Sequence, residues 1–468
     1  MSPEFVLDAP VKDQAEHTAP AWPGEPPWET AAGALRITRG ADPGQALVAV
    51  VGLSYAGLPS ALALRRAGFR IVGIDTSSIR LNDIRSGRAE LPGSRREDLP
   101  GQIGDEDFVL TDGIEAVHAA DLVLISVPAT VDRQGRANTE TLLRTCVSVV
   151  AHARAGQTLV LTSSARVGST RELLVKPLAE RGLRAGEDVF VAYSPERIDP
   201  GVPEHEQLST PRVVGAVTET CFAHASELLR HIAGQLHRVS SPEAAEMVKL
   251  YESTFRAVNI ALAFEMADAC QAQGVDPIEV TDAAATKPFG FMAHYPSAGV
   301  GGHGVGVDPH CLLAPLRERG RPATLAEEAV RTLAARPRRV AMRAHELLLR
   351  SGRQLRDVRV LVVGAAYKPG VGDCTNTPAA EIISLLAAEG AQVDFHDPLV
   401  PVLQVDGEAM HGIDPDPRRD ASGFGPEDYE LAILVSLHPG HDYGWLMRCP
   451  QVLDCTYRER TGRRRFLP

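Results

Sequence analysis

The chain has 468 residues, too many for a single hydrophobic core, so two or three domains are expected. Its hydrophobic fraction of 44% and charged fraction of 23% are ordinary for a globular protein, and no apolar run reaches the ~18 residues needed to cross a bilayer. The formal net charge of −12 disfavours a nucleic acid or an anionic membrane as the main partner, although a local cluster of lysines or N–H groups could still hold an anionic small molecule.

The seven cysteines are scattered without C-x-x-C or any other metal-ligand spacing, and their number is odd. Both features favour a reducing compartment over a disulfide framework, and neither suggests a metal site. The N-terminus also lacks a basic-then-apolar signal pattern. These observations predict a cytoplasmic enzyme without a bound metal.

Residues 1–44 are rich in proline, alanine and acidic residues and show no sustained hydrophobic period, which predicts a poorly ordered extension. The pattern changes at residue 46. A buried-strand run at 46–52 is followed by a turn, an apolar-periodic helix at 60–67 and a second strand that ends on Asp75.

This strand–turn–helix–strand unit has the pattern of a dinucleotide site. Gly52 would form the tight turn, the small Ser54 would let a pyrophosphate approach, and Gly57 would let the helix pack on the strand. A serine in place of the middle glycine weakens the match. The acid at Asp75 would bind ribose hydroxyls and disfavour a 2′-phosphate, so NAD is preferred to NADP. The cofactor candidates from this unit are Gly52, Ser54, Tyr55, Ala56, Gly57 and Asp75.

Strands and helices continue to alternate up to residue 196, which predicts a mostly parallel sheet. We expect strands at 121–128, 158–164 and 188–196, with helices around 138–152 and 170–182. Ligands of such sheets lie at the carboxyl ends of the strands, although residues there can also be ordinary turn residues. The site candidates at these ends are Ser126, Pro128, Ser164 and Glu196.

A long helix is predicted to begin at Ser241-Pro242-Glu243, because serine at the N-cap, proline at the first helical position and a following acid form a strong start signal. Lys249, Ser253 and Arg256 lie at helical spacing and are better site candidates than a lone solvated lysine. We expect the helix, about 45 Å long over ~30 residues, to bridge domains. It also offers a dimerisation face, an apolar stripe at Ala244, Val248, Tyr251, Phe255, Val258, Leu262 and Met266.

The segment 286–311 carries six glycines and three prolines and cannot be a helix interior or a central strand. A loop of this length is uncommon unless it binds a ligand or is disordered. Its aromatic residues and its single carboxylate, Asp308, argue against disorder. We interpret it as a binding loop whose backbone approaches a ligand closely; a mobile surface loop is the alternative.

The C-terminal part repeats the α/β pattern. A strand and turn at 358–373 carry Lys368, and a helix from about Pro378, a strand at 391–398 and two later apolar strands follow. The predicted fold class is therefore α/β, with two Rossmann-like domains joined by a long central helix and a cleft between them. The predicted segments are the extension 1–44, an NAD-binding domain 45–240, a central helical and dimerisation region 241–345, and a C-terminal domain 346–468.

With these motifs placed, residues 46–460 resemble the UDP-glucose/GDP-mannose dehydrogenase family, and most of all its branch that acts on UDP-N-acetylhexosamines. The resemblance implies two Rossmann-like domains around the long helix, a homodimer, and NAD as the oxidant. It also implies a UDP-sugar whose C6 alcohol becomes a carboxylate through two hydride transfers. The matching motifs are GLSYAGLP, YSPERIDPG at 193–201, AAEMVKLYESTFRAVNIALAFE at 244–265, TKPFGFM…YP…GVGGH…DP at 286–309 and AYKPGVGD at 366–373.

Carried over position by position, Lys249 and Asp308 match the family's catalytic lysine and aspartate. Glu196 matches the carboxylate of an S-P-E motif, and Ser164 stands where a threonine usually assists a water. Arg80 joins Asp75 as a match to the NAD ribose contacts. With Ser253 these residues complete the expected catalytic and cofactor sets. The expected substrate-binding residues, all within the matched motifs, are Arg197, Tyr295, Gly301, Gly302 and Lys368.

The chain departs from the family pattern at four places. Gly304 stands where the family has its nucleophilic cysteine, and Ser253 stands where it has asparagine. In the C-terminal motif D-x-R-x-S-P, Thr375 replaces an arginine that helps to hold the nucleotide. The family's P-G-P-G reads Pro296-Ser-Ala-Gly299 here.

A hydride cannot leave an aldehyde until a nucleophile has added to its carbonyl, and glycine offers none. We therefore expect oxidation to stop at the two-electron stage, with the aldehyde or ketone as product. One alternative is a complete four-electron oxidation with water or Cys311 as the nucleophile. Others are a non-catalytic relative that binds nucleotide sugars, and an enzyme that uses bound NAD transiently, as an epimerase does. A different nucleotide would fit the changed loops as well as a UDP-sugar.

Overall fold

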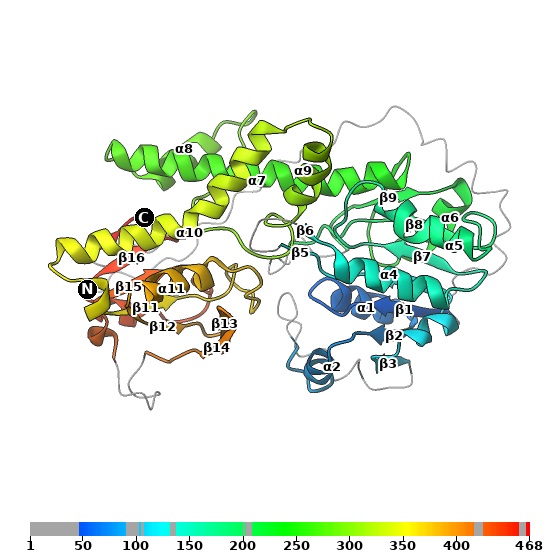
Figure 1. Cartoon of the computed structure of the whole chain (residues 1–468), viewed down its shortest axis with the longest axis horizontal. Helices are drawn as coiled ribbons and strands as arrows, with labels where there is room; N and C mark the ends of the chain where they lie inside the picture. Colours follow the sequence, from blue (N-terminus) through cyan, green and yellow to red (C-terminus); the bar gives the residue numbers. More distant parts are fainter. Residues whose placement is uncertain are drawn as a thin grey trace, which may run out of the picture. The chain divides into compact units, whose positions relative to one another are not determined.

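The computed structural model describes residues 46–89, 103, 107–131, 137–199, 202, 208–415, 425–457 and 465–468. The poorly ordered extension predicted for residues 1–44 lies outside these ranges. The described chain contains two larger, mostly parallel sheets, and long helices connect them along the sequence (Figure 1).

The N-terminal sheet has eight strands in the order β10-β9-β8-β7-β4-β1-β2-β3. All neighbours pair in parallel except β8 and β9, which are antiparallel. The short strands β5 (Thr130–Val131) and β6 (Ala137–Asn138) form a separate antiparallel pair. The strands of the large sheet are β1 (Leu47–Val51), β2 (Arg70–Ile74), β3 (Phe108–Thr111), β4 (Leu122–Ile125), β7 (Thr158–Leu161), β8 (Phe190–Tyr193), β9 (Arg212–Ala216) and β10 (Leu236–Val239).

Helices cover both faces of this sheet, as the alternation of apolar side chains along β1 shows. Val48 and Val50 point into one core with α1 (Gly57–Arg66) and α6 (Glu219–Leu229). Ala49 and Val51 point into the opposite core, which contains α4 (Glu140–His152) and α5 (Lys176–Glu180). Strands buried on both faces are typical of doubly wound α/β folds. The remaining helices of this part are α2 (Ser78–Arg85), the 3-10 helix η2 (Ile114–Ala119) and the π-helical turn η3 (Arg171–Val175).

The predicted long helix is α7 (Pro242–Ala272), with 31 residues. Its start signal works as expected, since the Ser241 hydroxyl accepts a hydrogen bond from the Ala244 N–H at 3.2 Å. The helix packs against α9 (Asp308–Glu318) and α10 (Thr324–Arg350), and α8 (Pro277–Ala285) follows it in the chain.

The large side chains of the predicted apolar stripe of α7 are mostly exposed, although Val248 and Val258 pack against cores within the chain. Tyr251 is 69% exposed and Leu262 is 52% exposed, and Phe255 and Met266 are exposed as well. The buried face carries mostly small residues, because these let neighbouring helices approach closely. It comprises Ala245, Leu250, Ala257, Ala261, Phe264 and Ala267. The stripe is therefore free to contact a second molecule, and dimerisation stays a prediction.

The C-terminal sheet has the parallel order β12-β11-β15-β16-β17. Its strands are β11 (Arg359–Val363), β12 (Gln392–His396), β15 (Leu431–Leu434), β16 (Val452–Asp454) and β17 (Arg465–Phe466). The other elements are α11 (Pro378–Ala388), the hairpin β13 (Val402–Val405) and β14 (Glu408–His411), and the 3-10 turns η5 (Leu355–Asp357), η6 (Pro426–Asp428) and η7 (Gly444–Arg448).

The first turn of this sheet repeats the turn after β1. Gly52 and Gly364 have φ angles of +91° and +94°, and each donates its N–H to the last residue of the next strand at 2.8 Å. An aspartate follows that strand in both cases, Asp75 or Asp397, and accepts backbone N–H groups of the turn. The predicted α/β class with two Rossmann-like units and a central helix is confirmed.

None of the helices within the described ranges is both long enough and apolar enough to cross a membrane. All seven cysteines lie within those ranges and are free thiols.

Candidate functional site

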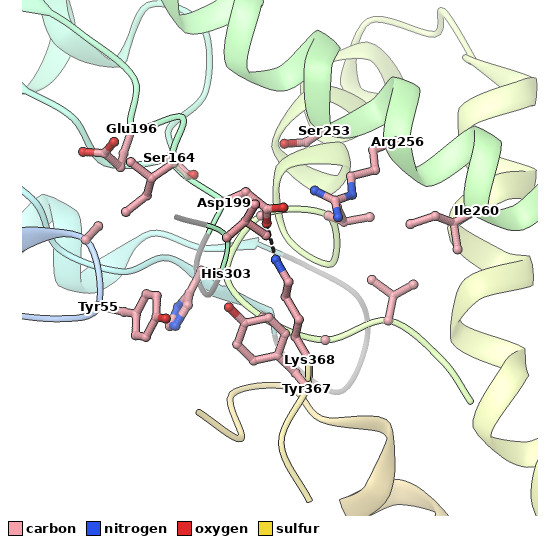
Figure 2. A pocket seen from close by; sticks show the side chains of 18 of the residues that line it. Tyr55, Ser164, Glu196, Asp199, Ser253, Arg256, Ile260, His303, Tyr367 and Lys368 are labelled. Atoms are coloured by element: carbon pink, nitrogen blue, oxygen red, sulfur yellow. Dashed lines mark hydrogen bonds and ion pairs between the residues drawn. The ribbon is translucent and has the colours of Figure 1, made fainter. Parts of the chain in front are cut away.

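A cavity of about 870 Å³ opens between the turn after β1, the middle of α7, the glycine-rich loop and the C-terminal sheet (Figure 2). A pocket of this size is normal for a site that binds small molecules. Most of the sequence-predicted site residues line it: Ser54, Tyr55, Ala56, Ser126, Pro128, Ser164, Glu196, Arg197, Lys249, Ser253, Tyr295, Gly301, Gly302 and Lys368. Gly52, Gly57, Asp75, Arg80 and Asp308 do not line it, and their positions explain why.

Gly52 and Gly57 shape the turn through their missing side chains. A Cβ on Gly52 would lie 2.4 Å from the carbonyl oxygen of Ser126, and its positive φ favours glycine in any case. A Cβ on Gly57 would lie 1.8 Å from the Gly52 carbonyl oxygen. The turn therefore brings backbone against backbone, as a dinucleotide-binding turn requires.

Asp75 and Arg80 also hold this turn. The Asp75 carboxylate accepts the N–H groups of Leu53 and Ser77, each at 2.9 Å, and Arg80 Nε donates to the Leu53 carbonyl oxygen at 2.8 Å. The N-terminus of α1 has no side-chain cap and no acid in its first turn, so its positive end can face a phosphate. These features fit NAD, whose bound nicotinamide accepts a hydride.

The strand-end residue Glu196 is fixed by arginines. One of its carboxylate oxygens is 2.9 Å from Arg212, whose side chain is buried, and the other accepts the Arg197 N–H at 3.1 Å. Arg197 itself forms two contacts with Glu252, at 2.7 and 3.3 Å. Glu196 thus keeps its charge paired at the edge of the cavity, which suits an orienting group better than a mobile base.

Lys249 and Ser253 reach the cavity one turn apart on α7. Lys249 Nζ donates to the Glu196 carbonyl oxygen at 3.0 Å and lies 3.9 Å from Asp308 Oδ2. Ser253 Oγ donates to the same carboxylate oxygen at 2.5 Å. The structure therefore brings together the three predicted groups Lys249, Ser253 and Asp308.

Asp308, however, does not face the cavity. It begins α9 and is 0% exposed, so it is fully buried. Burial raises the pKa of Asp308, while the charge of Lys249 and the hydroxyls of Ser164 and Ser253 act in the opposite direction. The predicted catalytic role of Asp308, acting directly or through a water, stays a prediction; in this structure the carboxylate is hydrogen-bonded to Ser253, which lines the cavity.

Gly304 lies at the centre of this group. A Cβ added there would be 3.6 Å from Asp308 Oδ2, 3.8 Å from Ser253 Oγ and 4.0 Å from Lys249 Nζ. These are ordinary van der Waals distances, so the missing side chain leaves a small polar space within the cavity rather than relieving a clash.

On the opposite side of the cavity, the loop residues Gly301 and Gly302 pack against the C-terminal sheet. A Cβ on either would come within 2.8 Å of Tyr367, and the Gly302 N–H donates to the Thr375 carbonyl oxygen at 2.7 Å. Tyr295 donates its hydroxyl to Asp282 at 2.9 Å. The glycines therefore serve close packing of the loop.

Lys368 bridges two loops that are far apart in the sequence. Its Nζ lies 2.5 Å from Asp199 Oδ1, a contact drawn as a dashed line in Figure 2. Burial lowers the pKa of Lys368, and the Asp199 carboxylate opposes this. An incoming anion has to compete with Asp199 for the lysine.

Three segments of the chain match the domains of one enzyme family. Residues 46–233 match the NAD binding domain of the UDP-glucose/GDP-mannose dehydrogenase family, residues 243–333 its central domain and residues 361–423 its UDP binding domain. The chain belongs to this family. It is therefore an NAD-dependent oxidoreductase that acts on nucleotide sugars, and the family and cofactor expected from the sequence are confirmed.

Individual members of the family align with most of this chain. The UDP-N-acetyl-D-mannosamine dehydrogenase of Pyrococcus horikoshii is 32% identical over 75% of this chain and 84% of the relative. The UDP-N-acetyl-D-glucosamine 6-dehydrogenase of Pseudomonas aeruginosa is 31% identical over 79% and 86%. A solved structure of UDP-D-ManNAc dehydrogenase from Pyrococcus horikoshii superposes with a TM-score of 0.78 at 27% identity and covers 90% of this chain and 98% of its own.

Cys311, the alternative nucleophile, is not available to this dehydrogenase site. It is 1% exposed on α9, does not line the cavity, and burial raises the pKa of its thiol to about 12. A buried, protonated thiol is a poor nucleophile. The structure thus argues against Cys311 as a substitute.

Sequence reasoning missed the polar contacts that two residues around the site, His303 and Arg336, make. His303 lines the cavity and lies 2.9 Å from Asp373. Burial alone would raise the pKa of Asp373, but the contact with His303 outweighs it and holds this pKa below its ordinary value. The fully buried Arg336 of α10 holds the glycine loop by donating to the Ser297 carbonyl oxygen at 3.1 Å.

Arg336 also contacts Asp268 of α7 at 3.1 Å and the Tyr457 hydroxyl at 2.6 Å. It therefore ties the loop to the central helix and the C-terminal sheet. No sequence pattern marked it, because a lone arginine on an amphipathic helix is normally solvated.

Proposed function

We propose that this dehydrogenase oxidises the C6 alcohol of a nucleotide sugar once and releases the aldehyde. The observation that supports this is Gly304, which has no side chain at a position where a Cβ would lie 3.6 to 4.0 Å from polar atoms of Asp308, Ser253 and Lys249. The groups that handle a proton are retained, and the position expected to carry the nucleophile is empty.

The first oxidation needs only the groups that remain. The C–H and O–H bonds of the alcohol break, a C=O bond forms, the hydride goes to NAD and the proton goes to the protein. The ammonium of Lys249 would hold the alcohol oxygen as its charge develops, and the Ser253–Asp308 pair would take the proton.

The second oxidation needs an adduct on the carbonyl carbon. A thiolate would form a thiohemiacetal, from which a second hydride could leave. Gly304 cannot form it, and Cys311 is buried with its thiol protonated. Only the aldehyde hydrate could be oxidised further, and water is a much weaker nucleophile than a thiolate.

For the substrate, we propose a UDP-linked acetamido sugar, the class named for the relatives from Pyrococcus horikoshii and Pseudomonas aeruginosa. Arg256 on α7 would contact the diphosphate, since within the described part of the chain it pairs with no carboxylate and it lines the cavity. Lys368 would give up its contact with Asp199 and bind the same diphosphate. Thr375, in place of an arginine, gives up a charge-assisted contact worth ~1.5–3 kcal/mol.

The stoichiometry of NADH formation tests the proposal. The protein is incubated with NAD and a panel of UDP-hexoses and UDP-N-acetylhexosamines, and NADH is counted against sugar consumed, with hydroxylamine present to trap an aldehyde. We expect one NADH per sugar and an oxime detected by mass spectrometry. Two NADH per sugar with a uronate product would refute the two-electron stop, and no NADH with any sugar would favour a non-catalytic binding protein.

We also propose that the enzyme works as a homodimer in the cytoplasm. The exposed apolar stripe of α7 supports the dimer, because contiguous exposed apolar surface marks interaction sites. The seven free thiols support a reducing compartment.

A further inference from the structure

The buried position of Asp308 raises the question of how a substrate proton reaches it. The carboxylate is 0% exposed, whereas Ser253 is 7% exposed and lines the cavity. Their oxygen atoms are 2.5 Å apart, at the short end for an O–H···O⁻ hydrogen bond. Ser164 and Lys249 line the cavity and act on this carboxylate as well, but the Ser253 hydroxyl lies much closer to it than Lys249 Nζ, which is 3.9 Å away.

We propose that Ser253 accepts the proton of the substrate's C6 hydroxyl while passing its own proton to Asp308. The proposal rests on the proposed function, since it assigns the proton of that oxidation. The substrate O–H bond and the Ser253 O–H bond break, a new O–H bond forms on each acceptor, and the hydride leaves carbon for NAD. Ser253 is then the catalytic residue, and Asp308 is a positioning residue that acts through it.

Lys249 is placed to hold the reacting oxygen rather than to take the proton. Its Nζ already donates to the Glu196 carbonyl oxygen at 3.0 Å, so the amine is oriented as a donor. At 3.9 Å from Asp308 Oδ2 it leaves that oxygen to the shorter bond from Ser253. Donor and acceptor roles are therefore divided between neighbouring turns of one helix.

Asp308 is well suited to receive a proton from Ser253. Its Oδ1 atom makes no hydrogen bond within the described part of the chain, so the ionised form is poorly solvated. The charged and titratable groups that face it are Lys249 and Glu252 of α7, Tyr193 of β8 and Cys311 of α9. Only Lys249 among these carries a positive charge, and burial favours the neutral acid.

Two of the four departures from the family pattern, Ser253 and Gly304, are neighbours in the structure. A Cβ at Gly304 would be 3.8 Å from Ser253 Oγ, an ordinary van der Waals distance, so a small side chain there would stand beside the hydroxyl without displacing it. The glycine leaves additional room for the substrate beside this hydroxyl. The cavity is thus connected to the buried Asp308 carboxylate through the Ser253 hydroxyl, beside the space that Gly304 leaves.

The test compares Ser253→Ala, Ser253→Thr and wild type by the pH dependence of kcat and by proton inventory in mixtures of H₂O and D₂O. Two protons moving together predict a curved inventory for wild type and for Ser253→Thr, which keeps the hydroxyl. In Ser253→Ala we expect kcat to fall about 10²–10⁴-fold with little change in KM, because general acid–base catalysis contributes that much. The acidic limb of its pH profile should also shift.

A matched control is Thr254→Ser, at the next position of α7, whose buried hydroxyl makes no hydrogen bond within the described residues. It should leave the inventory and the pH profile unchanged, and NAD binding should be equal in all variants. Ser253→Ala with kcat within threefold of wild type and the same acidic limb would overturn the relay. Two NADH per sugar together with a curved inventory would overturn only the two-electron stop, and absence of turnover with every sugar overturns both.

Discussion

Introducing a thiol at position 304 tests the proposed two-electron stop most directly. In Gly304→Cys the Cβ would sit 3.6 Å from Asp308 Oδ2, 3.8 Å from Ser253 Oγ and 4.0 Å from Lys249 Nζ, with no contact shorter than van der Waals distance. Gly304 is not among the glycines with a positive φ, so a side chain adds no backbone strain. A glycine replaced at a compatible position usually gains about 0.4–1 kcal/mol of stability, so the variant should fold.

The thiol would stand beside the ammonium of Lys249, which favours the thiolate. We therefore expect the Cys variant to consume two NAD per sugar and to yield the uronate, whereas wild type consumes one. Gly304→Ala and Gly304→Ser serve as controls for filling the space without a thiol, and both should keep the single oxidation.

The assay combines the NADH yield with mass spectrometry of the product and with an intact-mass measurement of a covalent adduct trapped on the variant's cysteine. A Gly304→Cys protein that reacts with iodoacetamide but still yields one NADH per sugar would refute the reasoning. In that case the missing thiol would not be what limits the reaction.

Three other substitutions follow from the described geometry. Because burial raises the pKa of Asp308, the stability that this group contributes is present at low pH and is lost as pH rises through its folded pKa. Asp308→Asn should therefore melt at a higher temperature than wild type at pH 8, and calorimetry should show the difference shrinking toward pH 5. A lower melting temperature of the variant at pH 8 would contradict this. Arg256→Gln should raise the KM for the nucleotide sugar about tenfold and weaken inhibition by inorganic diphosphate. Arg144→Gln, at an exposed position of α4, is the control and should do neither. Equal inhibition of the two variants by diphosphate would exclude Arg256 from the phosphate contact. Leu262→Glu on the exposed stripe should convert a dimer to monomers in analytical ultracentrifugation, and an unchanged sedimentation coefficient would place the interface elsewhere.

The sequence predicted those parts of the site whose geometry is local. The turn at Gly52 and Asp75 depends on neighbouring strands of one unit, and the row of Lys249 and Ser253 depends only on helical spacing. Both appear where the pattern indicated.

What the sequence did not predict depends on packing between distant elements. The burial of Asp308 results from α9 lying against α7, and the role of Arg336 results from three segments converging on one guanidinium. The face of α7 that packs inside the chain was not identified, because it is made mostly of small residues, which a hydrophobicity pattern scores below the larger exposed ones.

The pitch of α7 has a consequence for how such a site can change. Lys249, Ser253 and Arg256 lie within eight residues, about 10 Å along a rigid axis, so their mutual distances are set by the helix rather than by either sheet. Position 304 lies on a loop beside this fixed row. We therefore expect that a single exchange in the loop can alter the oxidation level of the product while the side chains on α7 keep their mutual distances.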